Sequence, residues 1–150
     1  MNDSRKHNSA TLILGIMLIV AAAIWGLIKL SSDDKGRILG DTNERRISYI
    51  SDFGWDAGTV HTALEEIRIP VTFDEEYEQY NALQKEQGFD LRKYRACYVK
   101  KYTYCITNYD EGSSPPIPIY ANLLVLDGEI IGADISSAEA GGFITVLAKK

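Results

Sequence analysis

Cysteine and histidine are scarce in this chain of 150 residues, and the motifs of common catalytic sites are missing. Two cysteines and two histidines are too few for a disulfide framework or a histidine-based metal site. There is no H-E-x-x-H zinc motif, no G-x-S-x-G nucleophile motif and no phosphate-binding loop. We therefore expect no metal, no cofactor and no enzymatic activity.

The two cysteines lie in one predicted strand. Cys97 and Cys105 are eight positions apart, which corresponds to about 26 Å along an extended strand. Disulfide geometry requires Cα atoms within about 7 Å of each other. We expect two free thiols on one face of the strand. A bridge would require the strand to bend back near Lys100 and Lys101.

An excess of basic residues is also missing. The whole chain has a net charge of −5, and the part from Asp41 to Lys150 contains 18 acidic and 11 basic residues, a net charge of −7. Nucleic acid repels an anionic domain, and no cluster of basic residues compensates for this. The charge pattern therefore predicts no nucleic-acid partner.

One long apolar run stands apart from the mixed remainder of the chain. Ala10 to Ile28 contains no charged residue, and a helix that crosses a bilayer needs about 20 mostly apolar residues. Trp25 and Lys29, at the end of this run, suit the interface with the lipid headgroups. We predict a single transmembrane anchor at residues 10–30.

A cleaved signal peptide is the alternative interpretation of this run, with a cleavage site at residues 21–23. The apolar residues that follow, from Ile24 to Ile28, favour the uncleaved anchor. Arg5 and Lys6 favour a cytoplasmic N-terminus. The prediction is a cytoplasmic tail at residues 1–9, a linker at 31–40 and an extracytoplasmic domain at 41–150.

Two helices are predicted in that domain. Asp41 to Phe53 has an apolar stripe at helical spacing and ends at Gly54. Thr72 to Gln87 ends at Gly88. Each helix is predicted to begin with a capping box. The paired residues are Asp41 with Glu44 and Thr72 with Glu75.

Strand-like segments make up most of the rest of the domain. They are Val60–Val71, Arg95–Tyr109, Ile119–Leu126 and Glu129–Ile135, with a loop at Glu111–Pro118 and a short apolar end at Phe143–Leu147. Asp127-Gly128 is a typical two-residue hairpin turn. We predict an α+β fold with two helices on one face of a mostly antiparallel sheet of three or four strands.

Tyrosines form one group of candidate binding residues. Tyr98, Tyr102 and Tyr104 fall on the same face of the strand Arg95–Tyr109. If exposed, this stripe would be a recognition surface. The alternative is that it packs under the helices through Tyr77 and Tyr80.

Asp134 and Asn122 are the second group. Strand alternation places Asp134 on the face of Ile130 and Gly132, and a buried carboxylate needs a partner. Asn122, on the neighbouring strand, is the expected partner. The pair is interpreted either as structural or as part of a groove shared with the tyrosines.

Several segments together resemble one protein family. They are Phe53-Gly54-Trp55, Ile69-Pro70, Tyr80–Leu91, Tyr102-Thr103-Tyr104, Tyr120–Val125, Asp127-Gly128 and Gly132–Ile135. The family consists of short membrane-anchored proteins of Gram-positive clostridia and their relatives (Firmicutes), catalogued as domain of unknown function 4830. The resemblance covers roughly residues 46–143. It implies a bacterial cell-envelope setting and no particular activity.

Three classes of function are compatible with these observations. The first is a membrane-anchored binding or regulatory module that contacts another envelope protein, as the lack of catalytic motifs favours. The second is a binder of small ligands or peptides that uses a cleft between helices and sheet. The third, an enzyme with an unfamiliar site, would require a carboxylate with a shifted pKa beside a nucleophile.

Overall fold

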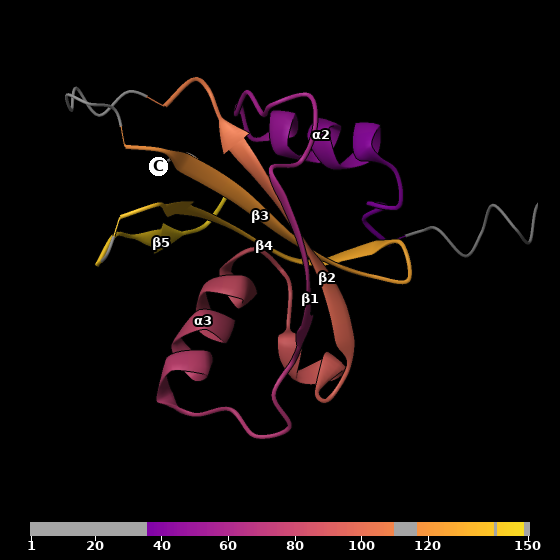
Figure 1. Ribbon diagram of the computed structural model, residues 1–150. Helices are drawn as coiled ribbons and strands as arrows, with labels where there is room; N and C mark the ends of the chain where they lie inside the picture. Colours follow the sequence, from indigo (N-terminus) through magenta and orange to yellow (C-terminus); the bar gives the residue numbers. More distant parts are fainter. Residues whose placement is uncertain (1–35, 110–116, 140, 149–150) are drawn as a thin grey trace, which may run out of the picture. The chain divides into compact units, whose positions relative to one another are not determined.

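The computed structural model describes residues 36–109, 117–139 and 141–148 (Figure 1). Within these ranges, no helix is long and apolar enough to cross a bilayer. The predicted anchor at residues 10–30 and residues 111–116 of the predicted loop lie outside the described residues. The compact domain begins at Ile38. The last residues of the predicted linker form backbone hydrogen bonds with the hairpin around Asp127-Gly128. Gly40 N donates to Gly128 O at 2.8 Å, and Ile130 N donates to Ile38 O at 2.7 Å.

An antiparallel sheet of five strands, in the order β1-β2-β3-β4-β5, forms the centre of the domain. The strands are β1 (Ala63–Arg68), β2 (Tyr98–Ile106), β3 (Ile119–Leu126), β4 (Glu129–Ser137) and β5 (Ile144–Thr145). The α+β class and the antiparallel sheet are confirmed. The prediction of three or four strands was too low, because the two residues of β5 are too few to show an alternating pattern.

The two helices lie on opposite faces of the sheet, not on one face as predicted. Figure 1 shows α2 (Asn43–Asp52) on one side and α3 (Glu75–Glu86) on the other. Adjacent residues of β3 therefore enter different cores: Leu123 packs in the cluster of Ile50, and Leu124 packs in the cluster of Phe73. A central strand that is apolar on both faces requires cover on both.

The helix ends are held by side-chain caps and by glycines. The Thr42 side chain accepts from Arg45 N, and the Asp74 side chain accepts from Tyr77 N. The predicted caps are therefore wrong: Asp41 is one position before the observed cap, Thr42, and Thr72 is two positions before Asp74. In each helix the capping oxygen accepts from the backbone amide three residues ahead. The glycine endings are confirmed, since Gly54 and Gly88 have φ of +81° and +86°.

The β3–β4 hairpin combines the predicted turn with a bulge that the sequence pattern does not reveal. Asp127 and Gly128 have φ of +48° and +80°, as a type I′ turn requires. The pairing shifts between Leu124 and Val125, which leaves one extra residue in β4. Ile131 therefore faces α3 and Ile130 faces α2, the reverse of the predicted alternation.

The segment before β2 differs from the predicted strand. A short 3-10 helix (Leu91–Tyr94) precedes it, and Ala96 has φ of +65°, so the strand begins at Tyr98. Cys97 and Cys105 are both free and half-buried, as predicted.

Candidate functional site

The five candidate residues are divided between the two faces of the sheet. Tyr102 and Tyr104 face α2, as does Tyr98, which shares their strand parity. Asn122 and Asp134 face α3, where Asp134 is bonded to Tyr80. A single groove lined by both groups, as the sequence allows, does not form, because the sheet separates them.

Tyr104 is a structural residue. Its side chain is fully buried, and its hydroxyl accepts from Arg46 Nε at 2.8 Å and donates to Asn43 Oδ1 at 3.0 Å. Burial raises the pKa of this phenol, against the opposing effect of the Arg46 guanidinium. Tyr104 therefore connects β2 to α2 and presents no surface to a ligand.

Arg46 organises the α2 face, and the sequence analysis did not identify it. Although charged, it is only 5% exposed. Its Nη1 donates to Gly40 O at 2.6 Å and to Asp41 O at 3.2 Å. Its guanidinium carbon lies 3.7 Å from the centre of the Tyr102 ring, a cation–π contact. The spacing from Arg46 to Ile50, one helical turn, was the available signal for an inward position.

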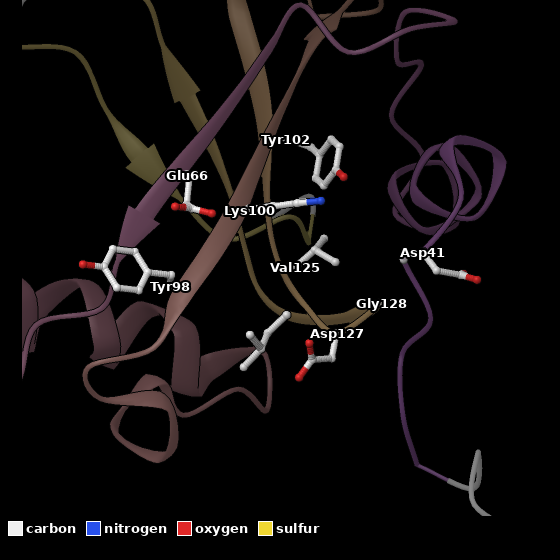
Figure 2. A pocket seen from close by; sticks show the side chains of 10 residues that line it. Asp41, Glu66, Tyr98, Lys100, Tyr102, Val125, Asp127 and Gly128 are labelled. Atoms are coloured by element: carbon white, nitrogen blue, oxygen red, sulfur yellow. The ribbon is translucent and has the colours of Figure 1, made fainter.

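A groove of about 310 Å³ opens beside these contacts (Figure 2). Arg46 fixes two parts of its wall, the Gly40-Asp41 segment and the Tyr102 ring. The remaining wall comes from β1, β2 and the β3–β4 hairpin. The lining residues are Gly40, Asp41, Glu66, Tyr98, Lys100, Tyr102, Val125, Leu126, Asp127 and Gly128.

Tyr98 is the most accessible of the three candidate tyrosines. It is 61% exposed, and the Arg68 guanidinium lies 5.6 Å from its ring centre. Tyr102 is half-buried between Arg46 and His61, whose ring centre is 5.4 Å away. Both tyrosines line the groove. Tyr102 forms a part of the wall that its neighbours hold in place, and Tyr98 forms an exposed part.

Charges of both signs surround the groove. Figure 2 shows Glu66 on one side of Lys100 and Asp41 on the other. Asp41 pairs with Arg45 at 2.8 Å, and this contact lowers the pKa of the carboxyl. No carboxylate of the described ranges forms an ion pair with Lys100. The groove thus offers Lys100 as a donor and the Glu66 carboxylate as an acceptor.

On the opposite face, Asp134 lies at the centre of a closed polar cluster. Its Oδ2 accepts from the Tyr80 hydroxyl at 2.8 Å, and its Oδ1 accepts from Asn122 Nδ2 at 2.7 Å. Asn122 also donates to Ser136 Oγ at 2.9 Å and accepts from Thr103 Oγ1 at 2.9 Å. The predicted partnership of Asn122 with Asp134 is confirmed, and we call these five residues the Asp134 cluster.

Burial dominates the electrostatics of the Asp134 cluster. Asp134 is 5% exposed, and this burial raises the pKa of its carboxyl, although the bonds from Asn122 and Tyr80 act in the opposite direction. Burial also raises the pKa of Tyr80 well above its ordinary value. Among the described residues, no buried side-chain polar atom lacks a partner. The cluster therefore joins α3 to the sheet, and both carboxylate oxygens of Asp134 are bonded within the chain.

Two glutamines that the sequence did not predict, Gln84 in α3 and its C-cap residue Gln87, complete this attachment. Gln84 accepts from Ala133 N at 2.8 Å and donates to Ala133 O at 3.0 Å. Gln87 donates to the same carbonyl at 2.8 Å and accepts from Leu147 N at 2.9 Å. The two amides satisfy the edge of β4 where the short strand β5 does not pair with it.

The alternative location for the tyrosine stripe, under Tyr77 and Tyr80, is therefore wrong. These two residues of α3 contact each other, with ring centres 5.8 Å apart, on the face that the stripe does not use.

The described residues also contain no group of three or more His, Cys, Asp or Glu side chains that could hold a metal ion.

Comparison with known proteins gives one match. The family model with the description "Domain of unknown function (DUF4830)" matches residues 49–135, more than half of the chain and most of the sheet. No curated protein and no solved structure matches.

Proposed function

The chain belongs to the family described as Domain of unknown function (DUF4830), and from that premise we propose a membrane-tethered binding module of the bacterial cell envelope. The uncharged run from Ala10 to Ile28 supports the tether, because its length suits one bilayer crossing. Arg5 and Lys6 support an extracytoplasmic position for the domain. The ligand site of the proposed module is the groove on the α2 face.

The observation that carries this proposal is the groove itself, walled by Tyr98 and Tyr102. Exposed tyrosines contribute strongly to protein interfaces because they bury a large area at low entropic cost. The volume of about 310 Å³ suits one or two side chains of a partner. The proposed occupant is a segment of another envelope protein that carries a basic side chain.

Charge supports that choice of occupant. The Glu66 carboxylate lines the groove, and residues 41–150 have a net charge of −7. A basic side chain would approach a favourable potential. Lys100 would donate to a carbonyl or carboxylate oxygen next to that side chain.

A small ligand is the second candidate occupant. Its support is again the volume, since about 300 Å³ is the lower end of the range for small-molecule pockets. The same aromatic and charged residues would orient such a ligand. The experiment below separates the two candidates.

The test is photo-crosslinking in living cells with a crosslinking phenylalanine analogue at Tyr98, followed by purification through a C-terminal tag and mass spectrometry. The matched control carries the analogue at Glu86, which is exposed on α3, away from the groove. We expect one dominant envelope protein from Tyr98 and none from Glu86. Equal recovery from both positions, or recovery of nothing but a second copy of the chain, would contradict the protein-binding proposal.

If Tyr98 captures nothing, thermal-shift screening of the full chain against small molecules tests the second candidate. A stabilising compound whose effect Lys100→Ala removes would support it. The tether is tested separately, by fractionation and by protease treatment of intact spheroplasts. We expect the C-terminal tag to sediment with membranes and to be digested from outside, whereas a protected tag would contradict an extracytoplasmic domain.

A further inference from the structure

Strand β1 forms one edge of the sheet, and no other strand of the described residues pairs with its outer side. It is the first strand in the order β1-β2-β3-β4-β5, and five of its six residues are exposed. The described part of the chain has five exposed large apolar side chains, and four lie in or beside this strand: Val60, Leu64, Val71 and Tyr98. Open edges with exposed apolar residues are sites of strand addition.

The backbone pairing shows which groups face outward. Ile69 N donates to Cys97 O at 2.9 Å, and Ile69 O accepts from Ala96 N at 3.0 Å, so the polar groups of Ile69 point toward β2. Residues of a paired antiparallel strand alternate in this respect. The backbone N–H and C=O groups of Leu64, Glu66 and Arg68 therefore point away from the sheet and can pair with an added strand.

We infer that this edge pairs antiparallel with β1 of a second copy of the chain, in a register centred on Ile67. A twofold axis through Ile67 places Glu66 opposite Arg68 of the second copy, and Arg68 opposite its Glu66. Both pairs use outward-facing backbone groups, so main-chain hydrogen bonds form beside each pair of opposite charges. The sheet becomes continuous across the two copies.

Charge selects this register over its neighbours. A register centred on Glu66 or on Glu65 places a glutamate against its own copy, and one centred on Arg68 places two arginines together. Like charges directly opposite one another destabilise a strand pair. Only the register centred on Ile67 replaces these contacts with two attractive pairs.

Apolar contacts follow from the same register. Ile67 lies opposite itself on the α3 face, where it is half-buried, and Leu64, 48% exposed, lies opposite Pro70 of the second copy. The overall negative charge of each domain opposes association, but at physiological salt only charges within about 8 Å interact strongly. Glu66 and Arg68, which lie directly between the two copies, therefore decide whether they associate.

The inference is tested by reversing charges in the full chain. Two differently tagged copies are co-expressed, solubilised in detergent, and recovered through one tag. Glu66→Arg places two arginines opposite each other, and Arg68→Glu places two glutamates opposite each other. We expect each variant, paired with itself, to lose at least tenfold in co-recovery relative to wild type.

The decisive sample combines the two variants. A copy with Glu66→Arg and a copy with Arg68→Glu are complementary at both positions, so we expect their co-recovery to return to within about twofold of wild type. This restoration also shows that both variants fold. Glu86→Arg, a matched reversal away from β1, should recover like wild type.

Three results would overturn the inference. The first is wild-type copies that do not recover each other. The second is unchanged recovery of the single variants with themselves, which would assign any association to another part of the chain. Loss that the mixed sample does not restore would also reject the register centred on Ile67.

Discussion

The two faces of the sheet use polar side chains in opposite ways. Under α3, Asp134 is buried and both of its oxygens accept a hydrogen bond. On the α2 face, Lys100 is exposed and forms no ion pair with a carboxylate of the described residues. The Asp134 carboxylate keeps its partners because a buried charge without hydrogen bonds would cost free energy, whereas the exposed Lys100 ammonium can exchange water for a ligand.

This comparison changes the interpretation of Asp134. A raised pKa in a carboxylate is a common mark of a functional site. Here burial causes the rise, and the surrounding donors are all occupied within the chain. The groove on the other face has the open surface that binding needs. Access, and not the perturbed pKa, distinguishes the candidate site in this domain.

The largest effect is expected from Asp134→Ala. It removes the acceptor of the Tyr80 hydroxyl and one of the two acceptors of Asn122 Nδ2, and a buried hydrogen-bonding group left without a partner costs about 1–3 kcal/mol. We expect the free energy of unfolding to fall by about 2–4 kcal/mol, measured by urea denaturation. Tyr80→Phe is the matched control and should lose only about 0.5–1.5 kcal/mol. Equal losses for the two variants would show that the carboxylate is not the centre of the cluster.

Arg46→Lys should have an intermediate effect on stability and a strong effect on the groove. Lysine cannot reach Gly40 O, the Tyr104 hydroxyl and the Tyr102 ring at once, because it lacks the planar fork of arginine. We expect a loss of about 1–3 kcal/mol in unfolding free energy by the same method. Crosslinking from Tyr98 should fall as the wall at Asp41 loosens. Unchanged crosslinking would mean that Arg46 does not shape the groove.

The pH dependence of stability should reflect the buried carboxylate. Because the pKa of Asp134 is raised above 3.8, the folded chain binds more protons than the unfolded chain between that value and the raised one. The unfolding free energy should therefore decrease as pH rises through this window, and Asp134→Asn should reduce the slope.

The comparison of wild type with Asp134→Asn at each pH separates the contribution of Asp134 from those of the other carboxyls. The pKa values of Asp41, Glu44 and Asp90 are lowered, so their contributions are lost as pH falls. Identical pH slopes for wild type and Asp134→Asn would show that Asp134 does not control the dependence.

The smallest effect on stability is expected from Tyr98→Ala. The side chain is 61% exposed, and substitutions at such positions usually change the unfolding free energy by less than about 0.5 kcal/mol. Recovery of the groove partner after formaldehyde crosslinking should nevertheless fall. Val71→Ala, at a residue 60% exposed outside the groove, should leave both quantities unchanged. A loss of partner from both variants would show that the effect is not specific to the groove.

Much of the fold could be predicted from local patterns. The hairpin at Asp127-Gly128, the bounds of β3 and the helix ends at Gly54 and Gly88 follow from backbone preferences that act within a few residues. The Asn122–Asp134 partnership was predicted from the adjacency of the two strands, but the hairpin turn alone would place Asn122 opposite Ala133, and it is the bulge in β4 that brings Asp134 opposite Asn122.

The candidate site was less predictable. Tyr98 and Tyr102 were identified, but Arg46 was not, because a charged residue on a helix is usually exposed. Lys100 and Glu66 were also missed, since the pairing of β1 with β2 joins residues 30 to 40 positions apart in the sequence. The bulge in β4 reversed the expected sides of Ile130 and Ile131, and no residue pattern marks its position.

The sequence by itself determined the approximate positions of four of the five strands, the hairpin, the helix endings and the excess of acidic residues, because each depends on neighbouring residues or on composition alone. The tertiary structure decided which face of the sheet each helix covers, and so separated the tyrosine stripe from Asp134. It also decided that Arg46 is buried and that β1 is an edge. These properties depend on contacts between distant segments, and their free energies exist only once the chain is packed.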